Sequence, residues 1–158
     1  MTRTIAVIGC GLIGRAWTIV FARAGCNVHL WDPVPEVRDA LPGLLEATCQ
    51  VSGDDPAALA RVTVAGSLDE ALAGAEWVQE NGPEQLDVKR ALYAQMDAVA
   101  APDTILASSS SALVASSFAA GLAGQGRILV AHPVNPPHVI PVVELCPSPE
   151  TRPEVMSA

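Results

Sequence analysis

The sequence has little charge, and few of its charged groups are positive. Charged residues make up 16% of the 158 positions, with 9 Lys and Arg against 17 Asp and Glu. The formal net charge of −8 disfavours binding to nucleic acid or to an anionic membrane surface. No apolar run is long enough to span a bilayer, no internal repeat is present, and the Gly-Lys-Ser/Thr of a nucleotide triphosphate P-loop does not occur. These absences favour one globular domain in the cytoplasm.

The cysteines show no CxxC pair and no histidine-associated spacing. The four of them are Cys10, Cys26, Cys49 and Cys146. This pattern argues against a metal site and a disulfide framework, so we expect reduced thiols and no metal. Half of the residues are hydrophobic, which is apolar for a soluble monomer and indicates a further buried face.

The segment TIAVIGCGLIG near the N-terminus organises the rest of the chain. A short buried strand, Ile5–Ile8, leads into Gly9-x-Gly11-x-x-Gly14, and a helix-like segment, Arg15–Ala24, follows. A second apolar run, Asn27–Trp31, ends in Asp32. Strand, glycine turn, helix, strand and acid in this order are typical of a dinucleotide-binding unit.

Each position in this unit has a physical reason. Gly9 permits the tight turn, Gly11 lets a pyrophosphate approach the backbone, and Gly14 lets the helix pack closely on the sheet. The free N–H groups at the helix start would meet the phosphate charge. Asp32, 18 residues beyond Gly14, would accept hydrogen bonds from the adenosine ribose hydroxyls.

The cofactor is predicted to be NAD rather than NADP. Pro33 and Val34 follow Asp32, so no adjacent Arg or Lys would compensate a 2′-phosphate. An S-adenosylmethionine site also uses a glycine loop and an acid, but the two-residue spacing before Gly14 argues against it. A glycine turn in an unrelated α/β protein is the other alternative.

The remaining pattern predicts an α/β fold of the Rossmann type: a doubly wound, mostly parallel sheet with helices on both faces. The second helix, Glu36–Gln50, is expected to be interrupted at Pro42-Gly43. The later helix, Gln85–Ala100, is expected to bury a stripe made of Leu86, Leu92, Met96 and Val99. Further strands are expected at Arg61–Ala65, Glu76–Gln79, Thr104–Ala107, Gly126–Ala131 and Val142–Leu145, with a short helix capped by Ser67 and Glu70.

Two polar segments follow strands. Glu80–Glu84 (ENGPE) contains Asn81 and reads as a ligand-facing loop, and the run Ser108–Ser111 reads as a hydroxyl-rich wall rather than a solvated linker. Lys89 lies on a side of its helix that could face the cofactor, or is an ordinary solvated lysine.

The C-terminal part of the sequence contains a histidine and an acid that could form a pair. Glu144 lies in an apolar strand, where a buried carboxylate would need a partner, and His132, at the end of the preceding strand, is the obvious one. The alternative is an exposed Glu144 beside a structural His132.

With the glycine loop, ENGPE, the serine run and AHPVNPPHVIPVVEL, the chain resembles the 3-hydroxyacyl-CoA dehydrogenase family, and within it the L-gulonate 3-dehydrogenase/λ-crystallin branch, with L-carnitine dehydrogenases nearby. The resemblance covers residues 1–158 as an NAD-binding Rossmann domain. The family's C-terminal helical domain, which completes the substrate site and the dimer, would then be absent from this chain, leaving it incomplete for catalysis.

The resemblance implies NAD-dependent oxidation of a secondary alcohol in a 3-hydroxy acid, and a homodimer when full length. It assigns catalysis to His132, Glu144 and Ser111. It assigns cofactor contacts to Leu12, Ile13, Asp32, Glu84 and Lys89, with Asn81 and Ser109 as further candidates. A short segment after Asp32, lacking lysine, favours a small hydroxy acid over a CoA thioester. The alternatives are a non-catalytic NAD-binding or crystallin-like structural module, and an S-adenosylmethionine-dependent transferase.

Overall fold

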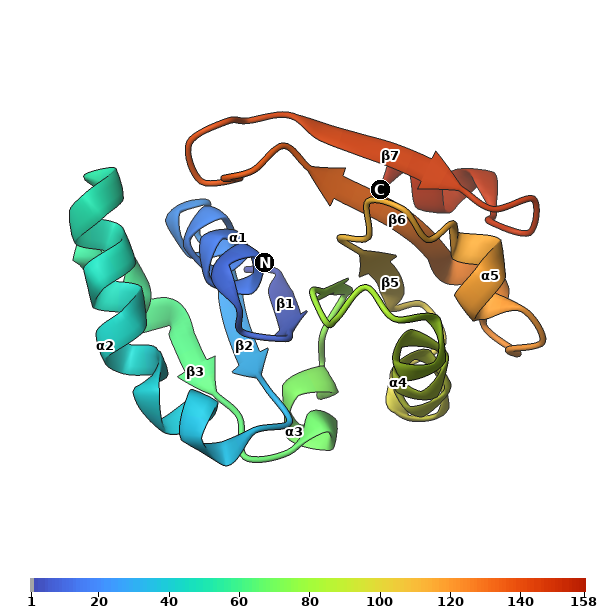
Figure 1. The fold of residues 1–158 in the computed structure, drawn as a ribbon, viewed down its shortest axis with the longest axis horizontal. Helices are drawn as coiled ribbons and strands as arrows, with labels where there is room; N and C mark the ends of the chain where they lie inside the picture. Colours follow the sequence, from blue (N-terminus) through green and yellow to red (C-terminus); the bar gives the residue numbers. More distant parts are fainter. Residues whose placement is uncertain (1) are drawn as a thin grey trace.

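The computed structural model describes residues 2–158 as a seven-stranded sheet between two helical layers (Figure 1). The strands are β1 (Thr4–Ile8), β2 (Asn27–Trp31), β3 (Val62–Val64), β4 (Trp77–Glu80), β5 (Ile105–Ser108), β6 (Ile128–Pro133) and β7 (Val143–Pro147). The α-helices are α1 (Leu12–Arg23), α2 (Pro35–Ser52), α3 (Leu68–Leu72), α4 (Leu86–Val99) and α5 (Ala115–Ala119). Short 3-10 helices occupy η1 (Pro56–Arg61), η2 (Gln125–Arg127) and η3 (Pro153–Ser157).

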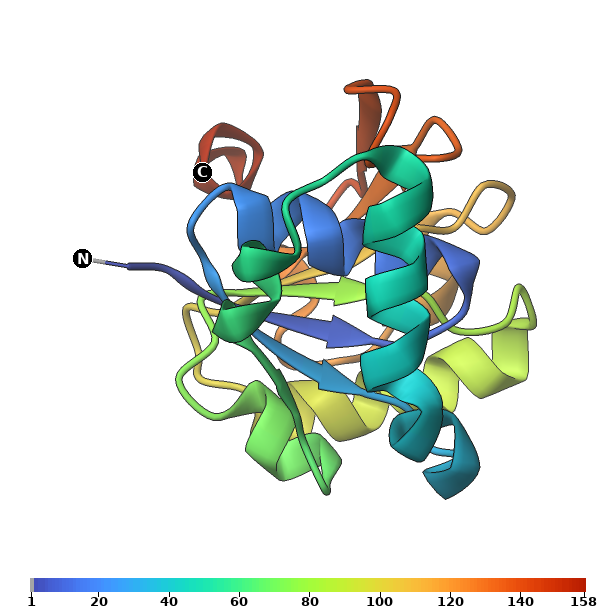
Figure 2. The same cartoon turned by 90° about the vertical axis from the view of Figure 1, so that its left-hand side faces the viewer.

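The strand order is β3-β2-β1-β4-β5-β6-β7, and all pairs are parallel except β6 with β7. The predicted doubly wound fold is confirmed. Because β1 and β4 are neighbours while the chain between them winds outward through β2 and β3, the order reverses beside β1. The carboxyl ends of β1, β2 and β4 point to one edge of the sheet (Figure 2), and ligands of such sheets bind at that reversal.

Each face of the sheet buries its own core. Helices α1 and α2 cover one face with a cluster that includes Val7, Leu30 and Leu41, whereas α3, α4 and α5 cover the other. Alternate residues of β1, such as Ile8, reach this second cluster, as expected for a strand buried on both faces. Among residues 2–158, no helix combines the length and apolar character needed to cross a membrane.

Two helix predictions need correction. Helix α2 runs without a break through Pro42, because Leu41, Leu45 and Cys49 pack into the core and offset the one lost backbone hydrogen bond. In α4 the buried face is Lys89, Tyr93 and Met96, while Leu86 and Leu92 are only partly buried and Val99 is 44% exposed. The predicted stripe was therefore rotated, since it left out a lysine whose charge is neutralised inside the protein.

Candidate active site

Two of the three glycines in the first turn, Gly9 and Gly14, lie where a side chain would clash, and the third, Gly11, faces open space. Gly9 has a φ of +88°, and a Cβ there would lie 2.9 Å from the backbone carbonyl of Asn81. A Cβ on Gly14 would collide with the carbonyl oxygen of Gly9, so helix and turn touch at this point. Gly11 has open space where its Cβ would be and lines a cavity.

The start of α1 can receive an anion. Gly11 caps the helix without any side-chain hydrogen bond, and no acidic residue lies in the first turn. Within residues 2–158, the N–H groups of Leu12, Ile13 and Gly14 have no hydrogen-bond partner, as the geometry of a helix start dictates. These donors and the helix dipole fit the pyrophosphate of the predicted dinucleotide.

Asp32 joins the end of β2 to the glycine turn. Its Oδ2 accepts a hydrogen bond from the Cys10 N–H at 2.8 Å, and its Oδ1 accepts one from the Val34 N–H at 3.0 Å. The carboxylate is thus held in one orientation at the cavity edge, with lone pairs left for ribose hydroxyls.

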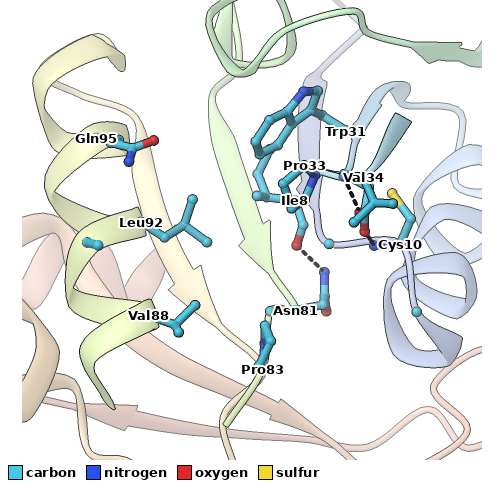
Figure 3. Close-up of a pocket in the computed structure, with 15 residues that line it drawn as sticks. Ile8, Cys10, Trp31, Pro33, Val34, Asn81, Pro83, Val88, Leu92 and Gln95 are labelled. Atoms are coloured by element: carbon cyan, nitrogen blue, oxygen red, sulfur yellow. Dashed lines mark hydrogen bonds between the residues drawn. The ribbon is translucent and has the colours of Figure 1, made fainter. Parts of the chain in front are cut away.

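A cavity of about 650 Å³ opens between this turn and α4 (Figure 3). Val88, Leu92 and Gln95 of α4 face Trp31 and Val34 across it, and Asp32 and Asn81 border it. Apolar walls with a few polar groups at one edge are what an adenine ring and its ribose require. The residues present therefore fit NAD.

Asn81 and Ser109 form one network beneath this cavity. The Asn81 amide donates to the backbone oxygens of Ile8 at 3.3 Å and Gln79 at 2.8 Å, and Ser109 Oγ donates to Asn81 Oδ1 at 2.7 Å. Ser109 Oγ also accepts from Trp17 Nε1 at 3.1 Å and from Gln79 Nε2 at 2.8 Å. The hydroxyl of Ser109 is then saturated, so in this structure it positions Asn81.

Glu84 holds the serine segment in place. Its Oε1 accepts from Ser110 Oγ at 2.5 Å and from the N–H groups of Ala112 at 2.9 Å and Leu113 at 3.2 Å. Partial burial acts to raise the pKa of Glu84, but these three hydrogen bonds, together with the charge of Lys89, outweigh it and hold the pKa below its usual value. The serine run is therefore an ordered wall, in which only Ser111 is exposed.

The structure does not bring Lys89 to the cavity. Its Nζ lies 2.8 and 2.7 Å from the two Glu80 carboxylate oxygens and donates to Ser108 Oγ at 3.3 Å. Both side chains of this pair are 1% exposed. The alternative of a solvated lysine is therefore wrong, since Lys89 is buried in an ion pair. Its contact with the cofactor stays a prediction, and it would require Lys89 to leave that pair.

His132, Glu144 and Ser111 line one small cavity of about 130 Å³ at the far end of the sheet edge. His132 and Glu144 are direct partners in the antiparallel register of β6 and β7, and His132 Nδ1 lies 2.9 Å from Glu144 Oε2. The expectation that Glu144 is buried is wrong, because its side chain is 73% exposed. The pair forms because the strand register places the two residues opposite each other.

Several residues that orient this site are not evident from the sequence. Trp17 and Gln79 hold Ser109. Arg15 donates to the backbone oxygen of Cys10, and Arg38 donates to that of Asp32. Gln79 could have been noticed as an amide inside an apolar strand. The arginines carry no such signal, since 23 positions separate them in the chain.

Comparison with known proteins identifies the family of this chain. The family model described as "3-hydroxyacyl-CoA dehydrogenase, NAD binding domain" matches residues 4–158. The λ-crystallin homolog of Bos taurus is 48% identical over 158 residues, covering 94% of this chain and 49% of that protein. L-carnitine dehydrogenase of Streptomyces coelicolor is 39% identical over 147 residues, covering 90% and 46%.

Among solved structures, 3-hydroxybutyryl-CoA dehydrogenase of Escherichia coli K12 superimposes with a TM-score of 0.86 and 30% identity, over 99% of this chain and 35% of that one. The chain spans about half the length of the curated relatives it matches. The chain thus belongs to the 3-hydroxyacyl-CoA dehydrogenase family and carries its NAD-binding domain.

Proposed function

We propose that this chain is the NAD-binding part of an enzyme that oxidises the secondary alcohol of a 3-hydroxy acid, with His132 and Glu144 as its acid–base pair. The observation that carries the proposal is the His132–Glu144 contact of 2.9 Å in a cavity that Ser111 also lines. Relatives named L-carnitine dehydrogenase and 3-hydroxybutyryl-CoA dehydrogenase, the second of which names a 3-hydroxyacyl substrate, support it.

His132, Glu144 and Ser111 have separate roles in the oxidation of the alcohol. The Glu144 carboxylate accepts a hydrogen bond from Nδ1–H of His132, which leaves Nε2 as the nitrogen that takes the hydroxyl proton. Glu144 then stabilises the charged ring of His132. General acid–base catalysis of this kind raises the rate by roughly 10²–10⁴-fold. Ser111 donates a hydrogen bond to the substrate oxygen and orients it. NAD, when bound, supplies the acceptor for the hydride that leaves the same carbon.

The substrate is a small-molecule hydroxy acid, of the L-gulonate-like or 3-hydroxyacyl kind. The segment between Asp32 and β3 is short and contains no lysine, which favours a small acid over a CoA thioester. A homodimer of the full-length protein and a cytoplasmic location are part of the same proposal.

Substitution of the histidine tests the role assigned to it. We expect His132→Asn in the full-length enzyme to lower kcat by about 10²-fold or more, because the substitution removes the base and leaves the cofactor cleft unchanged. His138→Asn, in the loop outside the cavity, is the matched control and should leave kcat within about twofold. Unchanged hydroxy-acid oxidation by the His132 variant would refute the assignment.

A second candidate is a non-catalytic NAD-binding or crystallin-like module, favoured by the 48% identity to a λ-crystallin homolog. It predicts saturable NADH binding without oxidation of any hydroxy acid. Turnover by the purified protein would exclude it.

A further inference from the structure

A glutamine lies inside the sheet, at a position of β4 where strands buried on both faces ordinarily carry apolar side chains. Gln79 is 0% exposed, and its neighbours Val78 in β4 and Ala107 in β5 are equally buried. A buried amide is costly unless its donors and its acceptor are paired. The structure pairs all of them, and the partners lead to two different parts of the candidate active site.

Each polar atom of the Gln79 amide has a hydrogen-bond partner. Its Oε1 accepts from Trp77 Nε1 at 3.0 Å, and its Nε2 donates to Ser109 Oγ at 2.8 Å and to the backbone oxygen of Ala131 at 3.2 Å. Because an indole N–H can only donate, Trp77 fixes which end of the amide carries the oxygen. The amide nitrogen is thereby directed toward Ser109 and Ala131.

The bond to Ala131 holds the strand that carries His132. Pairing between β5 and β6 ends at Val130, so Ala131 lies one residue beyond it and directly precedes His132. Ala107 lies between Gln79 and β6 in the register of the sheet, and its small side chain leaves room for the amide to reach across β5. Gln79 thus ties β6 to β4 at the point where pairing with β5 no longer does.

The bond to Ser109 leads to the glycine turn. Ser109 Oγ donates to Asn81 Oδ1 at 2.7 Å, and Asn81 Nδ2 donates to the backbone oxygen of Ile8, directly before the turn, at 3.3 Å. The backbone N–H of Asn81 donates to the same oxygen at 2.7 Å. One hydrogen-bonded network therefore runs from the turn expected to hold the pyrophosphate to the residue before His132, with Gln79 at its centre.

We propose that Gln79 is a positioning residue, whose amide sets where the strand bearing His132 lies relative to the glycine turn that holds the coenzyme. Hydride transfer needs the coenzyme and the base in one fixed arrangement, and a fully paired buried network imposes one because each member restricts the next. A methionine would fill a similar volume without these bonds, so packing alone does not explain an amide here. The inference rests on the proposed function, since it takes His132 as the base.

Gln79→Met in the full-length enzyme tests the inference, since methionine keeps the length of the side chain and removes its donors and its acceptor. We expect kcat to fall by about 10-fold or more, because a misplacement on the order of 1 Å between reacting groups can lower the rate by about 10²-fold. NADH binding should change by less than about threefold, since Ser109 keeps its bonds to Trp17 and Asn81.

Trp77→Phe is a second variant that leaves Gln79 in place. It removes only the donor that orients the amide, so we expect the same loss of kcat in smaller measure, about two- to tenfold, again without a matching loss of NADH affinity. Two variants that share this split between kcat and coenzyme binding separate a positioning role from a general loss of structure.

Thr104→Val is the matched control. Thr104 is 2% exposed, and its hydroxyl donates to the Ala75 backbone oxygen at 2.7 Å, at the amino end of β5 and away from the site. The substitution removes a buried hydrogen bond from the same sheet, so it should lower the free energy of unfolding as Gln79→Met does, yet leave kcat within about twofold. Urea denaturation verifies that each variant is folded and measures the loss of stability.

The imidazole signal of His132 in NMR spectra gives a readout that does not depend on turnover. With the histidines of the full-length protein isotope-labelled at Cε1, His132→Asn identifies that signal by its loss. We expect Gln79→Met and Trp77→Phe to shift it and Thr104→Val to leave it in place. An unmoved signal in both variants, or an unchanged kcat in Gln79→Met, would overturn the inference. Oxidation that survives His132→Asn would instead refute the assigned base, and the signal would still decide whether Gln79 positions this strand.

Discussion

At the scale of single residues, the glycine turn contains a thiol that its neighbours make unreactive. Cys10 is 1% exposed, and burial together with Asp32 raises the pKa of its thiol from 9.0 to about 12. Alkylation requires the thiolate, whose fraction at pH 8 is then about a thousandfold smaller. We predict that iodoacetamide labels exposed Cys146 first and Cys10 last, measured by mass spectrometry over time; raising the pH toward 12 should speed labelling of Cys10. Labelling of Cys10 in the native protein as fast as Cys146 would contradict the account.

At the scale of elements, a buried ion pair fixes the loop after β4 to α4. Lys89 of α4 binds the Glu80 carboxylate, whose Oε1 also accepts from the Gly82 N–H at 2.6 Å. Lys89→Met would leave Glu80 buried without its partner, and we expect it to lower the free energy of unfolding by about 3–5 kcal/mol. The neighbouring Arg90→Met, on the exposed side of α4, should cost less than about 1 kcal/mol. Urea denaturation measures both, and equal losses would mean that the pair does not anchor the loop.

At the scale of the whole molecule, the sequence predicts what depends on local pattern. The glycine turn, the Asp32 position and the parallel sheet follow from strand and helix periodicity, and the His132–Glu144 contact follows from two adjacent strands. Contacts between distant elements do not follow. Lys89 is polar in sequence, and only the packing of α4 against the sheet shows that Glu80 neutralises it.

The same limit applies to Arg15 and Arg38. The sequence shows no basic residue directly after Asp32, yet folding brings Arg15 of α1 to the backbone oxygen of Cys10 and Arg38 of α2 to the backbone oxygen of Asp32. Glu84 shows the same limit. Its hydrogen-bond partners Ser110, Ala112 and Leu113 belong to the loop that follows β5, more than 25 positions later in the chain. Residues that bind a ligand and residues that hold those residues in place look alike in a sequence, and only the fold separates them.

The central claim is that the cleft between the glycine turn and α4 binds NAD. Titration of the protein with NADH, followed by quenching of tryptophan emission, tests it directly, because Trp31 lines the cleft. We predict saturable quenching that NAD reverses by competition and S-adenosylmethionine does not, with Trp31→Phe removing most of the signal. No saturable quenching, or displacement of NADH by S-adenosylmethionine, would contradict it.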